Sequence, residues 1–162
     1  MADMTARNFD LLLEQAKSLA DRTLPFYSNL SNISALIMDH FSRLNWAGFY
    51  LLEGEELLLG PFQGKPACTR IPLGKGVCGH SASIRETVVV PDVHAFPGHI
   101  ACDGASQSEI VVPLCDGEKL FGVLDVDSPV LDRFSREDQT FFEALATGVI
   151  VPFLSASPYF HN

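Results

Sequence analysis

The sequence predicts a single α+β domain over residues 1–162, with a mostly antiparallel central sheet and N- and C-terminal helices packed on one face. With 162 residues, of which 47% are hydrophobic and 19% charged, the chain suffices for one core and is too short for two ordinary domains. Helical periodicity is confined to the two ends of the chain, and short apolar segments separated by turn residues fill the middle. Helices flanking a run of hairpin strands are typical of the α+β class.

Two helices are expected first. Residues 5–24 carry Phe9, Leu12 and Ala16 at helical spacing, and residues 28–44 repeat the pattern. Pro25 lies between them. The segment therefore predicts two short amphipathic helices.

Hairpin strands follow. Residues 46–52 and 56–62 flank a Glu-Gly-Glu turn, and residues 87–90 form a short apolar strand that ends at a proline. Residues 109–115 and 119–127 flank Asp116-Gly117, a pair that favours a tight hairpin turn.

A closing helix is expected from about residue 135 to residue 156, with Ser135 as its N-cap. Two long connections remain, at residues 63–81 and 91–107, and are expected to be loops. Loops of this length in a compact domain usually carry function. They contain three of the four cysteines: Cys68, Cys78 and Cys102.

The composition excludes some partners and suggests a compartment. The net charge of −9 argues against nucleic acid or an anionic membrane surface, because both attract basic residues. The N-terminus lacks an apolar signal region, and no stretch of about 18 apolar residues was identified. We therefore expect a cytoplasmic protein, whose cysteines are reduced, catalytic or metal-bound rather than structurally cross-linked.

The cysteines favour redox chemistry over a metal. Cys115, at a strand end, is expected to be a small buried hydrophobic residue, whereas loop thiols are exposed and reactive. Structural zinc sites use close ligand pairs, and the only close pair here, in Cys78-Gly79-His80, has poor spacing. No metal and no cofactor are therefore expected. A redox pair needs an attacking thiolate and a resolving thiol, and glycines in both loops would let them move.

Three acids are candidates for one site. Asp125 and Asp127 lie two apart on a strand and share a face. Glu109 lies on the partner strand. A two-residue loop at Asp116-Gly117 would place it opposite Leu124, on the wrong face, whereas a three-residue loop would place it opposite Asp125. One residue of register, or a bulge of equal effect, decides whether the acids converge.

Two aromatic residues share a strand face. Trp46 and Tyr50 are four apart, a backbone separation of roughly 13 Å. Either they are core aromatics, or they line a pocket for an apolar, cationic ligand beside the acids.

Three segments together resemble a known family. They are CTRIPLGKGVCGHSA, VVVPDVHAFPGHIACDGASQSEIVVPL and GVLDVDSP. The sequence resembles the free methionine-(R)-sulfoxide reductases, which are single GAF-domain enzymes, from about residue 5 to the final helix.

The resemblance implies a role for each candidate residue. Cys102 corresponds to the catalytic cysteine, Cys68 to the cysteine that closes a disulfide with it, and Cys78 to an auxiliary resolving cysteine. The substrate-binding residues would be Trp46, Tyr50, Glu109, Asp125 and Asp127.

The implied reaction is reduction of free L-methionine-(R)-sulfoxide through a Cys102 sulfenic acid and an intramolecular disulfide, which thioredoxin resets. Small α+β modules of this type often dimerise, so a homodimer is compatible with the sequence. The alternative function is a non-catalytic GAF sensor of a small ligand. A sensor is normally fused to an output domain, and we expect none in this chain.

Overall fold

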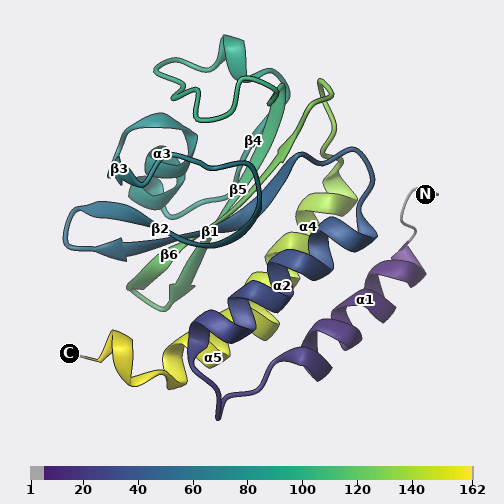
Figure 1. Ribbon diagram of the computed structural model, residues 1–162, viewed down its shortest axis with the longest axis vertical. Coiled ribbons are helices and arrows are strands. Elements are labelled where there is room, and N and C mark those ends of the chain that lie inside the picture. Colours follow the sequence, from purple (N-terminus) through teal and green to yellow (C-terminus); the bar gives the residue numbers. More distant parts are fainter. Residues whose placement is uncertain (1–5, 162) are drawn as a thin grey trace.

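The sheet has six strands in the order β3-β2-β1-β6-β5-β4, and every neighbouring pair is antiparallel. The computed structural model describes residues 6–161. Figure 1 shows α1, α2, α4 and α5 on one side of the sheet and α3 on the other. The predicted α+β class is confirmed, with the terminal helices on one face.

The strands are β1 (Trp46–Glu53), β2 (Glu56–Gly64), β3 (Arg70–Pro72), β4 (Val88–Val90), β5 (Ser108–Asp116) and β6 (Lys119–Ser128). The α-helices are α1 (Ala6–Leu19), α2 (Phe26–His40), α3 (Gly76–Ile84), α4 (Arg136–Leu145) and α5 (Val151–Ala156). Short helical turns occupy Val93–Ala95 and Pro158–Phe160. The expected start of the first helix at residue 5 lies outside the described residues.

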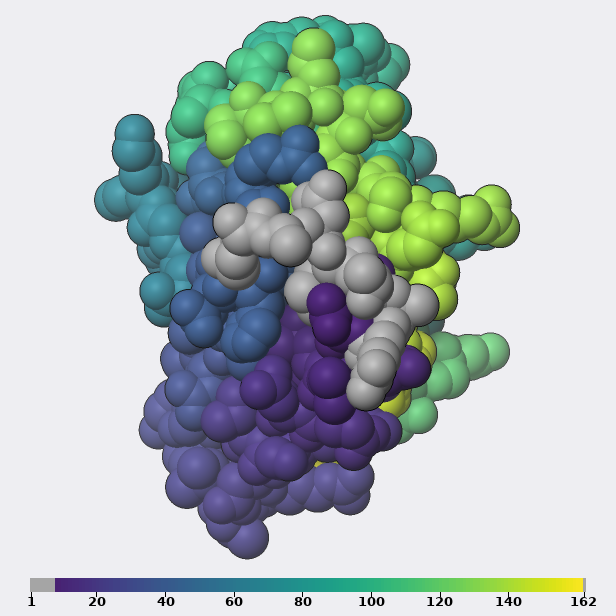
Figure 2. All heavy atoms as spheres, turned by 90° about the vertical axis from the view of Figure 1, so that its right-hand side faces the viewer, coloured from purple at the N-terminus to yellow at the C-terminus, as the bar shows by residue number. Residues whose placement is uncertain are grey.

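Each face of the sheet has its own core. Because side chains alternate along a strand, Leu124 and Val126 of β6 pack with the terminal helices, whereas Val123 packs toward α3. The acids at positions 125 and 127 therefore also point toward the α3 side. Figure 2 shows the outer surface of the helical layer, where α1 lies beside α2 and α4.

The closing helix begins as predicted. The Ser135 hydroxyl accepts the Asp138 N–H at 3.1 Å, and the Asp138 carboxylate accepts the Ser135 N–H at 2.8 Å, which completes a capping box. A π-helical turn at Ala146–Ile150 joins α4 to α5. By length and composition alone, Arg136–Ala156 could cross a membrane, a candidate that the sequence analysis overlooked. Half of the most apolar 18-residue stretch of this segment is buried inside the molecule, so packing in the core accounts for its apolar composition.

The connection over residues 63–81 is not the loop that was predicted. It contains β3 and α3, whose sequence, GVCGHSASI, has two glycines and only weak apolar periodicity. The two glycines are required by the backbone conformation and by close packing, whereas the sequence suggested that they make a loop mobile. Gly76 adopts φ +61°, and a Cβ on Gly79 would lie 2.5 Å from the Pro72 carbonyl oxygen. The second connection, over residues 91–107, has only the short turn at Val93–Ala95.

Candidate active site

The three acids converge because the β5–β6 hairpin contains a bulge. The turn residues are Gly117 and Glu118, so the turn has two residues and is displaced by one from the predicted pair. The register then shifts between Leu114 and Cys115. This shift turns Glu109 to the α3 side, where it pairs with Asp127 rather than with Asp125. The predicted convergence is confirmed, with a different cross-strand partner.

Glu109, Asp125 and Asp127 form what we call the acid cluster. Burial and the charge of Asp127 raise the pKa of Glu109 to about 8. Burial, followed by the charges of neighbouring cluster members, raises the pKa of Asp125 and of Asp127 well above the ordinary value. The surroundings therefore favour the protonated form of each of these carboxyl groups. The Oδ1 atoms of both aspartates are buried and lack a hydrogen-bond partner among the described residues, which leaves them available to a ligand.

Cys78 is not the exposed loop thiol that was expected. It lies on α3 with 5% of its surface exposed, and its Sγ donates to Glu109 Oε1 at 3.8 Å. Burial, with the charge of Asp125, raises the pKa of this thiol. Donor atoms of Cys78, Glu109 and Asp125 lie within 4.8 Å of one another, close enough to surround a cation. The hydrogen bond from Cys78 to Glu109 means that proton sharing also accounts for this arrangement.

Trp46 and Tyr50 form an aromatic wall. Their rings stack with centroids 5.9 Å apart, much closer than the backbone spacing suggested, because the indole leans over Gly48. Trp46 Nε1 donates to the Lys65 carbonyl at 3.1 Å, and the Tyr50 hydroxyl donates to the Cys68 carbonyl at 2.9 Å. Both side chains are 2% exposed, so they belong to the core and to the pocket wall at once.

A disulfide joins Cys68 to Cys102, with their Cα atoms 5.4 Å apart. It connects the segment before β3 with the long 91–107 connection. Cys115 is partly buried at the edge of the α3-side core, broadly as predicted.

A pocket lies between the sheet, α3 and the loop that carries Cys102. In this disulfide form its free volume is about 40 Å³, far below the roughly 300 Å³ or more of an ordinary ligand pocket. Of the eight predicted site residues, all but Cys68 line it: Trp46, Tyr50, Cys78, Cys102, Glu109, Asp125 and Asp127.

The pocket also contains residues that the sequence analysis missed. His99 Nε2 lies 4.0 Å from Glu109 Oε2, and burial and the charge of His94 lower the pKa of His99. Lys75 lies at the start of α3 and reaches the same pocket. The position of His99 three residues before Cys102, in the same loop, was the available signal.

Asn45 anchors the loop of Cys102 and was also missed. Its Nδ2 donates at 3.0 Å to both Asp103 Oδ2 and Ser106 Oγ, and its backbone N–H donates to the Asp127 carbonyl. The residue thus fixes the loop to the end of the strand that carries the acids. Nothing in the sequence distinguishes this asparagine from an ordinary turn residue.

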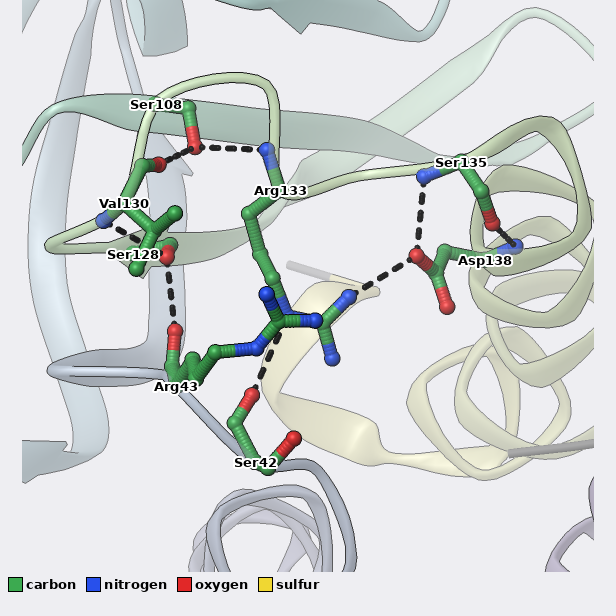
Figure 3. A network of polar contacts seen from close by, with 8 residues as sticks. All are labelled: Ser42, Arg43, Ser108, Ser128, Val130, Arg133, Ser135 and Asp138. Atoms are coloured by element: carbon green, nitrogen blue, oxygen red, sulfur yellow. Dashed lines mark hydrogen bonds and ion pairs between the residues drawn. The ribbon is translucent and has the colours of Figure 1, made fainter. Parts of the chain in front are cut away.

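Two buried serines fix the strand ends beside the acid cluster (Figure 3). Ser108, directly before one cluster member, donates to the Val130 carbonyl at 2.6 Å. Ser128, directly after another member, donates to the Arg43 carbonyl at 2.6 Å. These bonds limit movement of the strand ends and thereby of the carboxyl groups.

Arg133 connects the segment after β6 to the helices on the other face of the sheet. Its Nε donates to the Ser42 carbonyl at 3.1 Å, and its Nη1 lies 3.1 Å from Asp138 Oδ2 (Figure 3). Both side chains of this ion pair are more than nine-tenths buried, so removing one partner would leave an uncompensated buried charge.

This combination of a six-stranded antiparallel sheet, terminal helices on one face and a pocket on the other defines a GAF domain, and the chain matches the GAF domain family over residues 29–150. It is 54% identical over 114 residues to the Escherichia coli free methionine-R-sulfoxide reductase, covering 70% of this chain and 69% of that protein. It is 48% identical to the Saccharomyces cerevisiae enzyme of the same name, over 83% and 79% of the two chains.

Solved structures agree with these relatives. The structure of the Neisseria meningitidis free methionine-R-sulfoxide reductase in complex with its substrate matches with a TM-score of 0.90 and 42% identity, covering 98% of this chain and 95% of that one. The chain therefore belongs to the free methionine-R-sulfoxide reductase family.

Proposed function

We propose that this protein reduces free L-methionine-(R)-sulfoxide to methionine, with its own cysteines as the immediate reductant and thioredoxin as the external one. One observation carries the proposal. A single pocket is lined by Cys102, which is disulfide-bonded to Cys68, and by aspartates whose buried carboxyl oxygens lack a partner among the described residues. The family membership supports the same activity.

The pocket suits both ends of the substrate. The acid cluster supplies oxygen atoms for the α-ammonium group and for the proton that the sulfoxide oxygen needs. The aromatic wall of Trp46 and Tyr50 provides apolar contact for the methyl group and methylene chain.

The chemistry begins with reduced Cys102. Its thiolate sulfur takes the oxygen of the sulfoxide, so that the substrate S–O bond breaks, an S–O bond to Cys102 forms, and one proton is added to the oxygen. The substrate sulfur gains two electrons and the Cys102 sulfur loses two. Glu109, with a pKa of about 8, is protonated at neutral pH and is the natural proton donor.

Cys68 then resolves the sulfenic acid. Its thiol attacks the Cys102 sulfur, the disulfide forms and water leaves. A thioredoxin dithiol exchanges with this disulfide and returns both cysteines to thiols. The disulfide must be reduced before the next turnover, because Cys102 has no free thiolate while it is bonded to Cys68. Cys78, hydrogen-bonded to Glu109, is the proposed auxiliary resolving thiol.

A thioredoxin-coupled assay on separated R and S sulfoxides tests the proposal. Turnover should be confined to the free R form. Cys102→Ser should abolish it, and Cys68→Ser should release one methionine per enzyme and then recycle slowly. Cys115→Ser, at a partly buried cysteine outside the pocket, is the matched control.

Two results would count against this assignment. Near-wild-type turnover by Cys102→Ser would remove the mechanism. Ligand binding without consumption of reductant would favour the sensor alternative. A separate expectation concerns the order of disulfide formation: peptide mapping after sulfoxide treatment should give Cys68–Cys102 as the first disulfide formed.

A further inference from the structure

Three side chains with metal-binding donor atoms meet in the pocket, and each comes from a different element. Cys78 lies on α3, Glu109 on β5 and Asp125 on β6, and we call these residues the donor trio. One donor atom from each lies within 4.8 Å of the other two, and Cys78 Sγ is 3.8 Å from Glu109 Oε1. Spacing along the chain gives no sign of this group, because Cys78 and Glu109 are 31 positions apart.

The distances within the donor trio suit a small tetrahedral ion. Zinc binds a thiolate sulfur at about 2.3 Å and a carboxylate oxygen at about 2.1 Å, so two such ligand atoms lie about 3.6 Å apart at the tetrahedral angle. The 3.8 Å between Cys78 Sγ and Glu109 Oε1 is close to that value. The other separations, at most 4.8 Å, close by rotation of a carboxyl group. An ion therefore fits between the three side chains without movement of the backbone.

An independent observation shows that one of these donors lacks a partner. Asp125 is 5% exposed and lines the pocket, and its buried Oδ1 atom has no hydrogen-bond partner among the described residues. A buried carboxyl oxygen in this condition calls for a hydrogen-bond donor or a cation from outside the chain. The free volume of about 40 Å³ exceeds the roughly 10–15 Å³ that one water-sized occupant needs. The pocket therefore has room for an ion.

His99 offers a fourth donor and a route from solvent. Its Nε2 lies 4.0 Å from Glu109 Oε2, and its side chain is 16% exposed, so the ring reaches from the surface to the donor trio. Burial and the charge of His94 lower the pKa of His99, and the neutral ring is the form that binds metal ions. A thiol, an imidazole and two carboxyl groups suit zinc, whereas Mg²⁺ and Ca²⁺ prefer six or more oxygen ligands.

A divalent cation would also offset the electrostatic cost of this group. Burial, followed by neighbouring negative charge, raises the pKa of Cys78 and of Asp125, because the pocket disfavours their anionic forms. A bound ion displaces protons from the thiol and the carboxyl groups to solvent, and its two positive charges stabilise the anions that remain.

We propose that the donor trio, with His99 as the fourth donor, is a binding site for Zn²⁺ or a divalent cation of the same borderline-soft, tetrahedral class. Binding rests on the geometry alone. The consequence for activity rests on the proposed function: the ion occupies carboxyl oxygens assigned to the substrate and removes the proton of Glu109, so it inhibits the reductase. The ion is thus an inhibitor and takes no part in the reaction.

The disulfide form of the whole chain tests binding without the catalytic thiol. In this form Cys68 and Cys102 are bonded to each other, and the Cys115→Ser substitution leaves Cys78 as the only free thiol. Co²⁺ is the probe, because a thiolate bound to Co²⁺ absorbs in the near ultraviolet. We expect one equivalent of Co²⁺ to produce this absorption, Zn²⁺ to abolish it by displacement, and Mg²⁺ to leave it unchanged.

Substitutions in this Cys115→Ser background locate the ion. Cys78→Ser should remove the thiolate absorption and weaken Zn²⁺ binding, measured by calorimetry, at least about tenfold. Glu109→Gln and Asp125→Asn preserve side-chain volume and the thiol, and each should also weaken binding about tenfold. Glu55→Gln, at an exposed turn position, is the matched control and should bind as the parent protein does.

Single-turnover release of methionine by the reduced protein measures the consequence for activity. No external reductant is present, so Zn²⁺ acts on the enzyme alone. We expect Zn²⁺ to suppress the release and a chelator to restore it, with Mg²⁺ as the control ion. Full release by protein that holds Zn²⁺ at the donor trio would overturn the inhibitory role.

The outcomes separate this inference from the proposed function. If the disulfide form binds Co²⁺ without thiolate absorption, or binds Zn²⁺ no more tightly than its Cys78→Ser variant, the metal site is wrong while the reductase activity stands. Binding by the reduced protein alone would assign the ion to Cys68 and Cys102 and would also overturn the site. Thiolate absorption from Cys78 in a protein that reduces no methionine sulfoxide would support the metal site and overturn the proposed function.

Discussion

Replacing Glu109 by Gln should abolish activity and at the same time make the fold less sensitive to pH. Glu109 is 6% exposed, and burial together with the charge of Asp127 raises its pKa to about 8. The ordinary value is 4.5. Between these two pH values the folded protein keeps a proton that the unfolded chain releases.

The direction in which pH changes the stability follows from this difference in bound protons. Because unfolding releases a proton, rising pH favours the unfolded state, and the wild type loses stability from about pH 4.5 up to about pH 8. Each pH unit in this interval changes the free energy of unfolding by about 1.4 kcal/mol. Glu109 thus accounts for a loss of about 3 kcal/mol between pH 4.5 and pH 7. Gln occupies the same volume and has no proton to release, so its variant should lack that loss.

Urea unfolding of the disulfide form, at about pH 4.5 and about pH 7, measures the effect. Relative to wild type, Glu109→Gln should gain about 3 kcal/mol on going to the higher pH. Glu55→Gln, at an exposed turn position, is the control and should follow the wild-type pH dependence. If the Glu109→Gln and wild-type stabilities change in parallel with pH, Glu109 is ionised in the folded protein and cannot be the proton donor.

Three further predictions address the ligand, the aromatic wall and the disulfide. N-acetyl-methionine-(R)-sulfoxide should have a kcat/KM at least about thirtyfold lower than the free amino acid, because acetylation removes the charge that the acid cluster binds; equal kinetics would exclude an ammonium site. Gly48→Ala should cost about 1–3 kcal/mol in urea unfolding and raise KM, because the new Cβ would lie 2.3 Å from Phe62 Cβ and 2.8 Å from the Trp46 ring and must displace both; an unchanged KM would contradict the placement of this aromatic wall against the substrate. Reducing the Cys68–Cys102 disulfide should lower the free energy of unfolding by up to about 4 kcal/mol, since it closes a loop with a sequence separation of 34. Cys68→Ser should show no such dependence on reductant.

Local patterns in the sequence were sufficient for the main elements of the fold. Apolar periodicity located the terminal helices, and Ser135 was recognisable as an N-cap because the acidic residues Glu137 and Asp138 follow it in the first turn of the helix. The period-two rule placed Asp125 and Asp127 on one face without any knowledge of their neighbours. These inferences succeeded because each depends on residues close together in the chain.

The α3 side was harder to predict. The helix has weak apolar periodicity, and the reason for its second glycine, the close approach of the Pro72 carbonyl to Gly79, lies outside the helix. Burial of Cys78 against Glu109 follows from that helix packing on the sheet, so the sequence could not reveal that this thiol is enclosed. Asn45 and its bonds to Asp103 and Ser106 join segments about 60 residues apart, beyond any local pattern.

The sequence by itself determined which residues could do the chemistry: the cysteines, the acids and the aromatic pair. Only the tertiary structure decided that the acids meet. A two-residue turn at Gly117 and Glu118 would leave Glu109 on the wrong face, and the bulge beyond it restores the match with Asp127. The bulge lies next to Gly122, where a Cβ would overlap the Tyr50 carbonyl of β1. The face on which Glu109 lies is thus set by a bulge beside a close contact between strands, and turn propensity encodes neither feature.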